Sequence, residues 1–292
     1  MPARRDRTRL AIEVTVYIVL GWVAMSVAGW AAVPLGGYLV GITVAVFSAA
    51  LFVNWLTFTI YERRHLADAG LHLRAAGRDN LLFGLAGGIG AACIALLPGL
   101  LAGAAHLVRT PNDTPSTGTF LFIAACLAVG AAGEEILFRG YAFQILIANV
   151  GDWTTILPVA VLFASMHAGN PHATYLALAN TAGFGVLFGY AFLRSRDLWL
   201  PIGVHFGWNV TLPLFGVQVS GLRMKMTGYQ LQWSAGTLWS GGDYGPEGSI
   251  LASVAMVALA IYLWKAPIRR QPSALLDPPA ENALCEPPPS QS

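Results

Sequence analysis

The chain has 292 residues, of which 55% are hydrophobic and only 11% are charged, with a formal net charge of +2. A soluble domain typically carries about 25% charged residues, so this composition excludes an ordinary soluble protein and favours one with several membrane spans. The small net charge gives no indication of a nucleic-acid partner, and we expect none. The three cysteines include no CxxC pair, so they support neither a disulfide framework nor a thiolate zinc site.

Apolar stretches close to the roughly 20 residues that cross a bilayer follow one another along the chain. We predict an all-α polytopic membrane helix bundle of about eight transmembrane helices, over residues 10–33, 38–60, 81–105, 119–147, 153–168, 173–193, 198–217 and 249–264. The bundle occupies residues 1–265, and a disordered cytoplasmic tail is expected over 266–292 because this segment is rich in Pro, Ser and Glu.

The basic residues predict the orientation of the bundle. Lys and Arg gather in four segments, at the N-terminus, over 61–80, over 194–197 and after residue 264. With eight spans these segments lie on one side, which the positive-inside rule places in the cytoplasm. We therefore expect an integral protein of the inner or plasma membrane with both termini in the cytoplasm.

Two adjacent carboxylates, Glu134 and Glu135, follow an apolar run that otherwise reads as a membrane helix. Carboxylates at membrane depth are costly, so they indicate a functional site. Neighbouring acids repel each other, and at least one of them needs a cation or a proton. Arg139, four residues after Glu135 on the same helical face, can supply that cation. Glu134 points about 100° away around the helix and is free for another partner.

Two further i,i+4 pairs that contain a histidine occur on later helices, Phe163 with His167 and His205 with Asn209, and each spacing places both side chains on one helix face. A glutamate and a neutral histidine can share a water and remove its proton. A histidine N–H and an asparagine amide can donate to the oxygen of a tetrahedral intermediate. The set predicts a buried site that hydrolyses a peptide bond, and the structural alternative is a polar network that holds the bundle together.

In this order and spacing, the three motifs resemble the CAAX protease and bacteriocin-processing family of intramembrane proteases, which includes the type II CAAX prenyl endopeptidase. The similarity covers a catalytic core of about 119–217 and implies a membrane-associated protein or peptide as substrate. It implies these roles: Glu134 as the base, His167 orienting the water, His205 and Asn209 as the oxyanion hole, and Glu135 with Arg139 supporting the site.

Three alternatives stay open. Glu134, His167 and His205 could bind zinc as a His₂Glu set with an open fourth position. Because Asn209 is a poor zinc ligand and no His-Glu-x-x-His pattern is present, we favour a metal-free mechanism that requires no cofactor. The same bundle could instead be a non-enzymatic immunity or scaffold protein, or a proton-coupled transporter, although no repeat relates the two halves of the chain.

The depths of the two histidines present a conflict. His205 lies early in the predicted helix 198–217, whereas His167 lies late in 153–168. At 1.5 Å per residue, they should be well separated along the membrane normal if both helices start at the interface. A common site therefore requires shifted helix boundaries, or tilted helices around a water-filled cavity.

Overall fold

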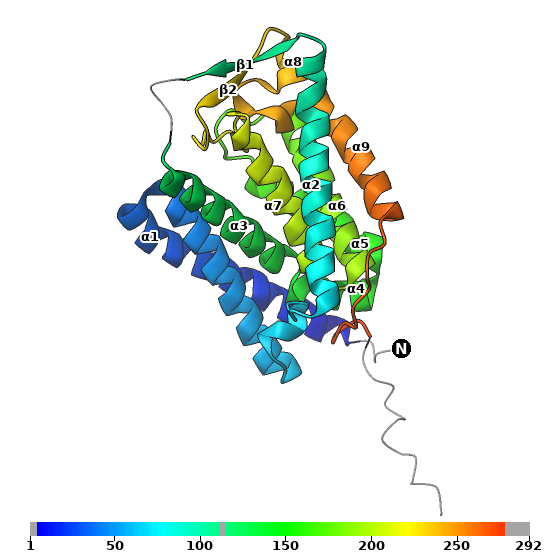
Figure 1. Cartoon of the computed structure of the whole chain (residues 1–292). Coiled ribbons are helices and arrows are strands. Elements are labelled where there is room, and N and C mark those ends of the chain that lie inside the picture. The colour runs from blue at the N-terminus through cyan, green and yellow to red at the C-terminus, as the bar shows by residue number, and fades with distance from the viewer. Residues whose placement is uncertain (1–4, 111–114, 278–292) are drawn as a thin grey trace, which may run out of the picture.

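The computed structural model describes residues 5–110 and 115–277 (Figure 1). Its helices are α1 (Arg7–Thr57), α2 (Ala75–Leu101), α3 (Thr117–Arg139), α4 (Tyr141–Val150), α5 (Asp152–Met166), α6 (Tyr175–Ser195), α7 (Trp199–Leu214), α8 (Thr237–Ser240) and α9 (Ile250–Lys265). Two short strands, β1 (Ala105–Arg109) and β2 (Tyr229–Trp233), pair antiparallel with Ala105 opposite Trp233. The predicted helical membrane bundle is confirmed, and the sequence analysis missed this small sheet, which replaces the predicted end of helix 81–105 and part of the loop after it.

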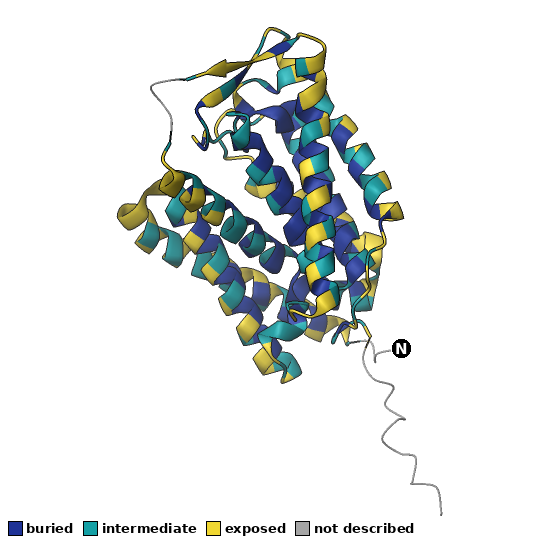
Figure 2. Ribbon diagram, in the orientation of Figure 1, coloured by how far each residue is buried: buried dark blue, intermediate teal, exposed yellow. Residues whose placement is uncertain are grey.

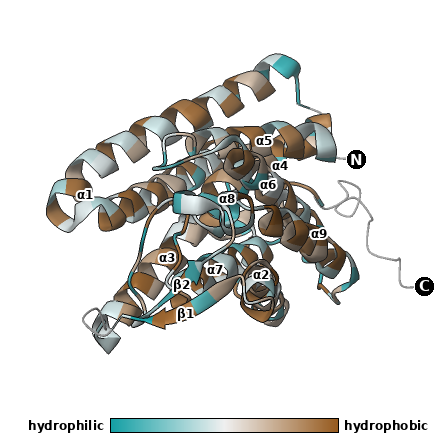
Figure 3. Cartoon of the chain, turned by 90° about the horizontal axis from the view of Figure 1, so that it is seen from above, coloured by the Kyte–Doolittle hydropathy of each residue, from teal (hydrophilic) through white to brown (hydrophobic). Residues whose placement is uncertain are grey.

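Among the described residues, four helical segments are long and apolar enough to cross a membrane, Arg7–Glu62, Ala75–Leu101, Thr117–Val150 and Tyr175–Ser195, and α5 and α9 are shorter apolar helices. Many large apolar residues are exposed, such as Trp30 at 82%. Exposed residues lie on the outward faces of the helices (Figure 2). Seen from above, the helices consist mostly of residues with hydrophobic hydropathy values (Figure 3). An apolar exterior of this kind suits lipid contact, and the chain is an integral membrane protein. The count of eight spans stays a prediction.

The first long segment, α1, is a hairpin of two arms. Gly37 has non-helical backbone angles, φ 75° and ψ −178°, at the turn that was predicted between residues 33 and 38. A Cβ at Gly41 would overlap Val33, and Asn54 donates to the Tyr17 hydroxyl over 2.9 Å, so the arms run antiparallel. Positive φ is readily accessible to glycine, which explains the residue at the turn.

The predicted helix 119–147 is wrong in one respect, because it breaks at Gly140. α3 ends at Arg139, Gly140 takes ψ −141°, and α4 starts at Tyr141. The Asn54 side chain accepts a hydrogen bond from the Tyr141 N–H at 2.7 Å, which satisfies one backbone donor at the start of α4. A Cβ at residue 140 would collide with Asn54, so the break requires glycine.

Glycines allow α2 and α7 to pack backbone against backbone. A Cβ at Gly84 would overlap the Leu200 carbonyl oxygen, and one at Gly88 would overlap that of Val204. The contact is reciprocal, since a Cβ at Gly207 would lie 2.6 Å from the Leu85 carbonyl oxygen. The Gly84-x-x-x-Gly88 spacing is therefore a helix-packing motif, and it fixes the height of α7, which carries His205.

We expect Gly88→Val to lower the free energy of unfolding by about 1–3 kcal/mol, because the added side chain must separate two backbones. Gly90→Val is the matched control, since no atom lies within 4 Å of a Cβ placed at Gly90. Thermal unfolding in detergent micelles measures both variants. Equal losses of stability in the two variants would contradict close packing at Gly88.

The basic segments meet at one end of the bundle, which we call the basic end and define as residues 5–9, 61–80, 194–197 and 265–277. Arg5 forms an ion pair with Glu62, and the Leu198 N–H donates to the Gly70 carbonyl at 3.0 Å. The Gln271 N–H donates to the Ser195 carbonyl at 2.7 Å. The first part of the predicted tail thus lies against the bundle, and residues 278–292 lie outside the described residues. The opposite end, which we call the strand end, consists of residues 102–110, 167–174 and 215–249.

Candidate active site

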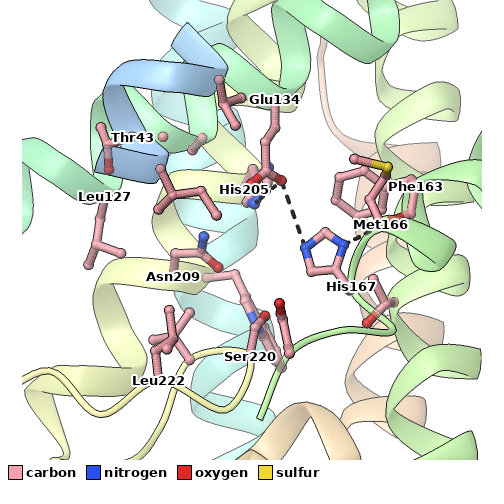
Figure 4. A pocket seen from close by; sticks show the side chains of 18 of the residues that line it. Thr43, Leu127, Glu134, Phe163, Met166, His167, His205, Asn209, Ser220 and Leu222 are labelled. Atoms are coloured by element: carbon pink, nitrogen blue, oxygen red, sulfur yellow. Dashed lines mark hydrogen bonds and ion pairs between the residues drawn. The ribbon is translucent and has the colours of Figure 1, made fainter. Parts of the chain in front are cut away.

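A cavity of about 240 Å³ lies within the bundle, and its wall is built by α1, α3, α5, α6, α7 and loops of the strand end. Four of the predicted site residues line it, Glu134 from α3, His167 after α5, and His205 and Asn209 from α7 (Figure 4). The remaining two, Glu135 and Arg139, lie behind the wall and are fully buried. Three helices that are separate in sequence therefore contribute to one polar site.

Both histidines of the site lie close to the carboxylate of Glu134. Its Oε2 lies 3.8 Å from the Nε2 of His205 and 4.0 Å from the Nε2 of His167. The Glu134 side chain is 27% exposed, yet Oε2 itself is buried and has no hydrogen-bond partner among the described residues. Glu134 thus lines the cavity and brings an unpaired carboxylate oxygen close to both histidines.

The structure resolves the depth conflict, because both histidines approach the same carboxylate. His167 and His205 lie within 4.0 Å of Glu134 Oε2, so the two side chains are at the same depth in the bundle. The α5 helix ends at Met166 rather than at the predicted residue 168, and His167 is the first residue beyond it.

The ion pair of Arg139 and Glu135 is buried behind Glu134, and it contacts His205. Arg139 Nη1 lies 3.3 Å from Glu135 Oε2, as the i,i+4 spacing predicted, and neither side chain is exposed. Glu135 Oε1 also lies 2.8 Å from His205 Nδ1, a contact that the sequence did not indicate. The Arg139 guanidinium donates to the Gly185 carbonyl at 2.8 Å and stacks over Phe163 and Phe188. Glu135 therefore links the arginine to the face of α7 that lines the cavity.

Both imidazoles use Nδ1 for orientation and direct Nε2 into the cavity. His167 Nδ1 lies 2.8 Å from the Phe163 carbonyl, and His205 Nδ1 faces the Glu135 carboxylate, so each Nδ1 is assigned the proton because its neighbour can only accept. Phe163 and Phe188 pack on the rings of His167 and His205, with ring centroids 4.7 Å apart in each case. In their neutral forms, the two histidines therefore present Nε2 lone pairs toward Glu134.

The sequence analysis missed a second carboxylate in the wall, Glu247. This residue is 7% exposed, and it accepts hydrogen bonds from Trp208 Nε1 at 3.3 Å and from the Ser220 N–H. Burial raises the pKa of its carboxyl, and the hydrogen bonds from Ser220 and Trp208 oppose that rise. Nothing in the polar, glycine-rich sequence around Glu247 indicated a site residue.

Phe188, which packs on the ring of His205, was also not predicted. The sequence did hold a signal for it, because Phe188 lies four residues after Phe184 on the same face of α6.

The zinc alternative does not match this geometry. Ligand distances of about 2.0–2.1 Å around a tetrahedral zinc ion place neighbouring ligand atoms roughly 3.3 Å apart. The separations from Glu134 Oε2 to the histidines are longer, at 3.8 and 4.0 Å. Among residues 5–110 and 115–277, no group of three or more His, Cys, Asp or Glu side chains is arranged to hold a metal ion. Metal dependence stays a prediction, and a chelation experiment tests it below.

Comparison with known proteins agrees with the site. Residues 114–211 match the family described as type II CAAX prenyl endopeptidase Rce1-like. This segment of the chain is similar to that family. All three motifs lie inside the Rce1-like segment, so the resemblance drawn from them is confirmed.

One curated relative extends the comparison. The chain is 29% identical over 119 residues to the "Putative membrane peptidase YdiL" of Bacillus subtilis (strain 168). The aligned part is 41% of this chain and 47% of that relative, so the chain matches about half of the relative's length. Like the Rce1-like segment, the alignment covers only part of this chain.

Proposed function

We propose that the chain is an intramembrane endopeptidase that hydrolyses a peptide bond in a membrane-associated protein or peptide. The observation that carries this proposal is the position of Glu134 Oε2, unpaired and facing the Nε2 atoms of His205 and His167 at 3.8 and 4.0 Å. These distances are too long for direct hydrogen bonds, and they suit a bridging water. The Rce1-like core supports the same class of reaction.

Glu134 is the general base in this mechanism. A water bound between its carboxylate and His167 loses a proton to Glu134 as the water oxygen attacks the carbonyl carbon of the substrate. The electron pair of the carbonyl bond moves to its oxygen, and a tetrahedral intermediate forms. When the C–N bond breaks, the proton on Glu134 passes to the leaving nitrogen. The products are a new carboxyl terminus and a new amino terminus.

Asn209 and His205 stabilise the negative oxygen of the intermediate. The Asn209 amide is a donor in every protonation state, whereas His205 Nε2 donates only when the ring is an imidazolium. Glu135, 2.8 Å from His205 Nδ1, favours that charged form and fixes the ring, as a buried carboxylate does for other catalytic histidines. Arg139 in turn pairs with Glu135 at 3.3 Å and holds its carboxylate in place.

A strong chelator is expected to leave the peptidase activity of the purified protein unchanged. The reason is that the proposed water is held and deprotonated by side chains alone. The measurement compares cleavage rates before and after dialysis against EDTA, with zinc added back to a parallel sample. Loss of activity with EDTA and its recovery with zinc would establish the zinc-dependent alternative instead.

The proposal is tested against a non-enzymatic role by comparing the protein termini of membrane fractions from cells that express wild-type protein or Glu134→Gln. An endopeptidase produces new carboxyl and amino termini that are present only with the wild type. A scaffold or immunity protein gives the same termini with both, and retains its biological effect in the variant.

A further inference from the structure

Glu247 is a carboxylate in the wall of the cavity that the proposed mechanism does not use. It lies in the loop that precedes α9, and the residue is only 7% exposed. Moving a carboxylate out of water costs free energy unless hydrogen bonds or a cation offset the loss. The partners of Glu247 therefore indicate whether its charge is already compensated.

The hydrogen bonds to the Glu247 carboxylate come from neutral groups. Trp208 Nε1 donates to Oε1 at 3.3 Å, the Ser220 hydroxyl donates to Oε1 at 3.2 Å, and the Ser220 N–H donates to Oε2. An ionised carboxylate offers about four acceptor positions, so these three bonds leave one position open. The two N–H groups can only donate, which suits the ionised form.

A counter-ion is missing from this arrangement. Glu135 pairs with Arg139, whereas no Lys or Arg within 5–110 and 115–277 forms an ion pair with Glu247. Burial raises the pKa of the Glu247 carboxyl, and a cation bound beside it would lower that pKa and stabilise the ionised form.

The rest of the cavity wall adds to this negative character. None of the described lining residues is Lys or Arg. The acids and imidazoles in the wall are Glu134, Glu247, His167 and His205. With both imidazoles neutral, the wall carries two carboxylates and no fixed cation, so it attracts a positively charged group.

Glu247 is held at a fixed position beside the catalytic residues. Asn180 of α6 donates to the Glu247 carbonyl at 2.8 Å. Trp208, which donates to the Glu247 carboxylate, directly precedes Asn209 on α7. In Figure 4, Glu134 and Ser220 lie on opposite sides of the view, with His167 and Asn209 between them. A substrate carbonyl held at Asn209 would therefore place neighbouring residues of the substrate near Glu247.

We propose that Glu247 binds a cationic side chain of the substrate, an ammonium or guanidinium group close to the scissile peptide bond, and so sets the sequence preference of the site. This role rests on the proposed endopeptidase function. A lysine or arginine of the substrate brings the missing counter-ion, and its N–H groups can use the open acceptor position of the carboxylate. An acidic side chain at the same place is repelled.

The sequences around the cuts test this preference. Wild type, Glu247→Gln and Asp243→Asn are each reconstituted in liposomes with membrane proteins from cells that lack the protein, and mass spectrometry identifies the new termini. Asp243 is the matched control, because it is an exposed carboxylate of the same loop that does not line the cavity. We expect Lys or Arg to be enriched at one fixed position near the cut with wild type and Asp243→Asn, and this enrichment to disappear with Glu247→Gln.

A second measurement does not depend on the folding of a variant. In one protein that the wild type cuts, the basic residue near the cut is replaced by methionine. We expect cleavage by the wild type to slow by about 10- to 100-fold, the worth of a hydrogen bond to a charged group. Cleavage by Glu247→Gln should change little with the same replacement, and thermal unfolding shows whether that variant is folded.

Three results would overturn the role of Glu247 while leaving the proposed function in force. These are Glu134-dependent cuts without a basic residue at a fixed position, the same preference in Glu247→Gln with all cuts uniformly slower, and wild-type cleavage that tolerates methionine at that position. The absence of any Glu134-dependent cut would contradict the proposed function and, with it, the role of Glu247.

Discussion

Glu134→Gln is expected to lower the rate of peptide cleavage by about 10²–10⁴-fold, the contribution of a positioned general base. The glutamine amide has the same size, but it cannot accept the proton of the attacking water. Stability should change little, since Glu134 is partly exposed and its Oε2 has no hydrogen-bond partner among the described residues. The measurements are the cleavage rate of the purified protein and its thermal unfolding.

Asp79→Asn is the matched control for the loss of one carboxylate. Asp79 pairs with Arg269 at 3.0 Å on the surface of the basic end, away from the cavity. This control should retain the wild-type cleavage rate. Equal activity of Glu134→Gln and wild type would exclude Glu134 as the base, and an equal loss in both variants would point to a general effect of charge.

Arg139→Met is expected to lower the free energy of unfolding by about 3–5 kcal/mol, the usual cost of removing one partner from a buried ion pair. Neither Arg139 nor Glu135 has any side-chain exposure, so water cannot compensate the remaining carboxylate. The variant also loses the hydrogen bond to the Gly185 carbonyl. Unfolding in detergent micelles measures the loss of stability.

The double variant Glu135→Leu with Arg139→Met separates stability from activity. Replacing a buried ion pair by apolar side chains of similar size is often neutral or stabilising, so much of the lost stability should return. Activity should not return, because His205 Nδ1 then has no carboxylate to hold it. A double variant with wild-type activity would show that Glu135 has no part in orienting His205.

The elements that the sequence predicted well are those that follow from spacing alone. The i,i+4 positions of Glu135 and Arg139 led directly to their ion pair. Glycine at residue 37 indicated the turn of the α1 hairpin, and the order of the three motifs indicated the Rce1-like core. For the ion pair and the turn, local geometry restricts the possible structures strongly, whereas the motif order indicated the core through its resemblance to a known family.

The features that the sequence did not predict depend on contacts between distant segments. The break at Gly140 requires Asn54 from another helix, and Glu247 reaches the cavity only because its loop folds back over α7. Pairing of β1 with β2 joins strands more than 100 residues apart, and such long-range pairing leaves little trace in a short window of sequence. The common depth of His167 and His205 was not predicted, because hydropathy marks the helices along the sequence but not how far neighbouring helices are shifted along one another.

Glu134-dependent proteolysis is tested most directly with purified protein reconstituted in liposomes together with membrane proteins from cells that lack it. Mass spectrometry of the termini identifies each peptide bond that is cut. We predict cuts with the wild type that are absent with Glu134→Gln and with His205→Ala, and retained with Asp79→Asn. The same set of cuts from wild type and Glu134→Gln would contradict the proposed active site.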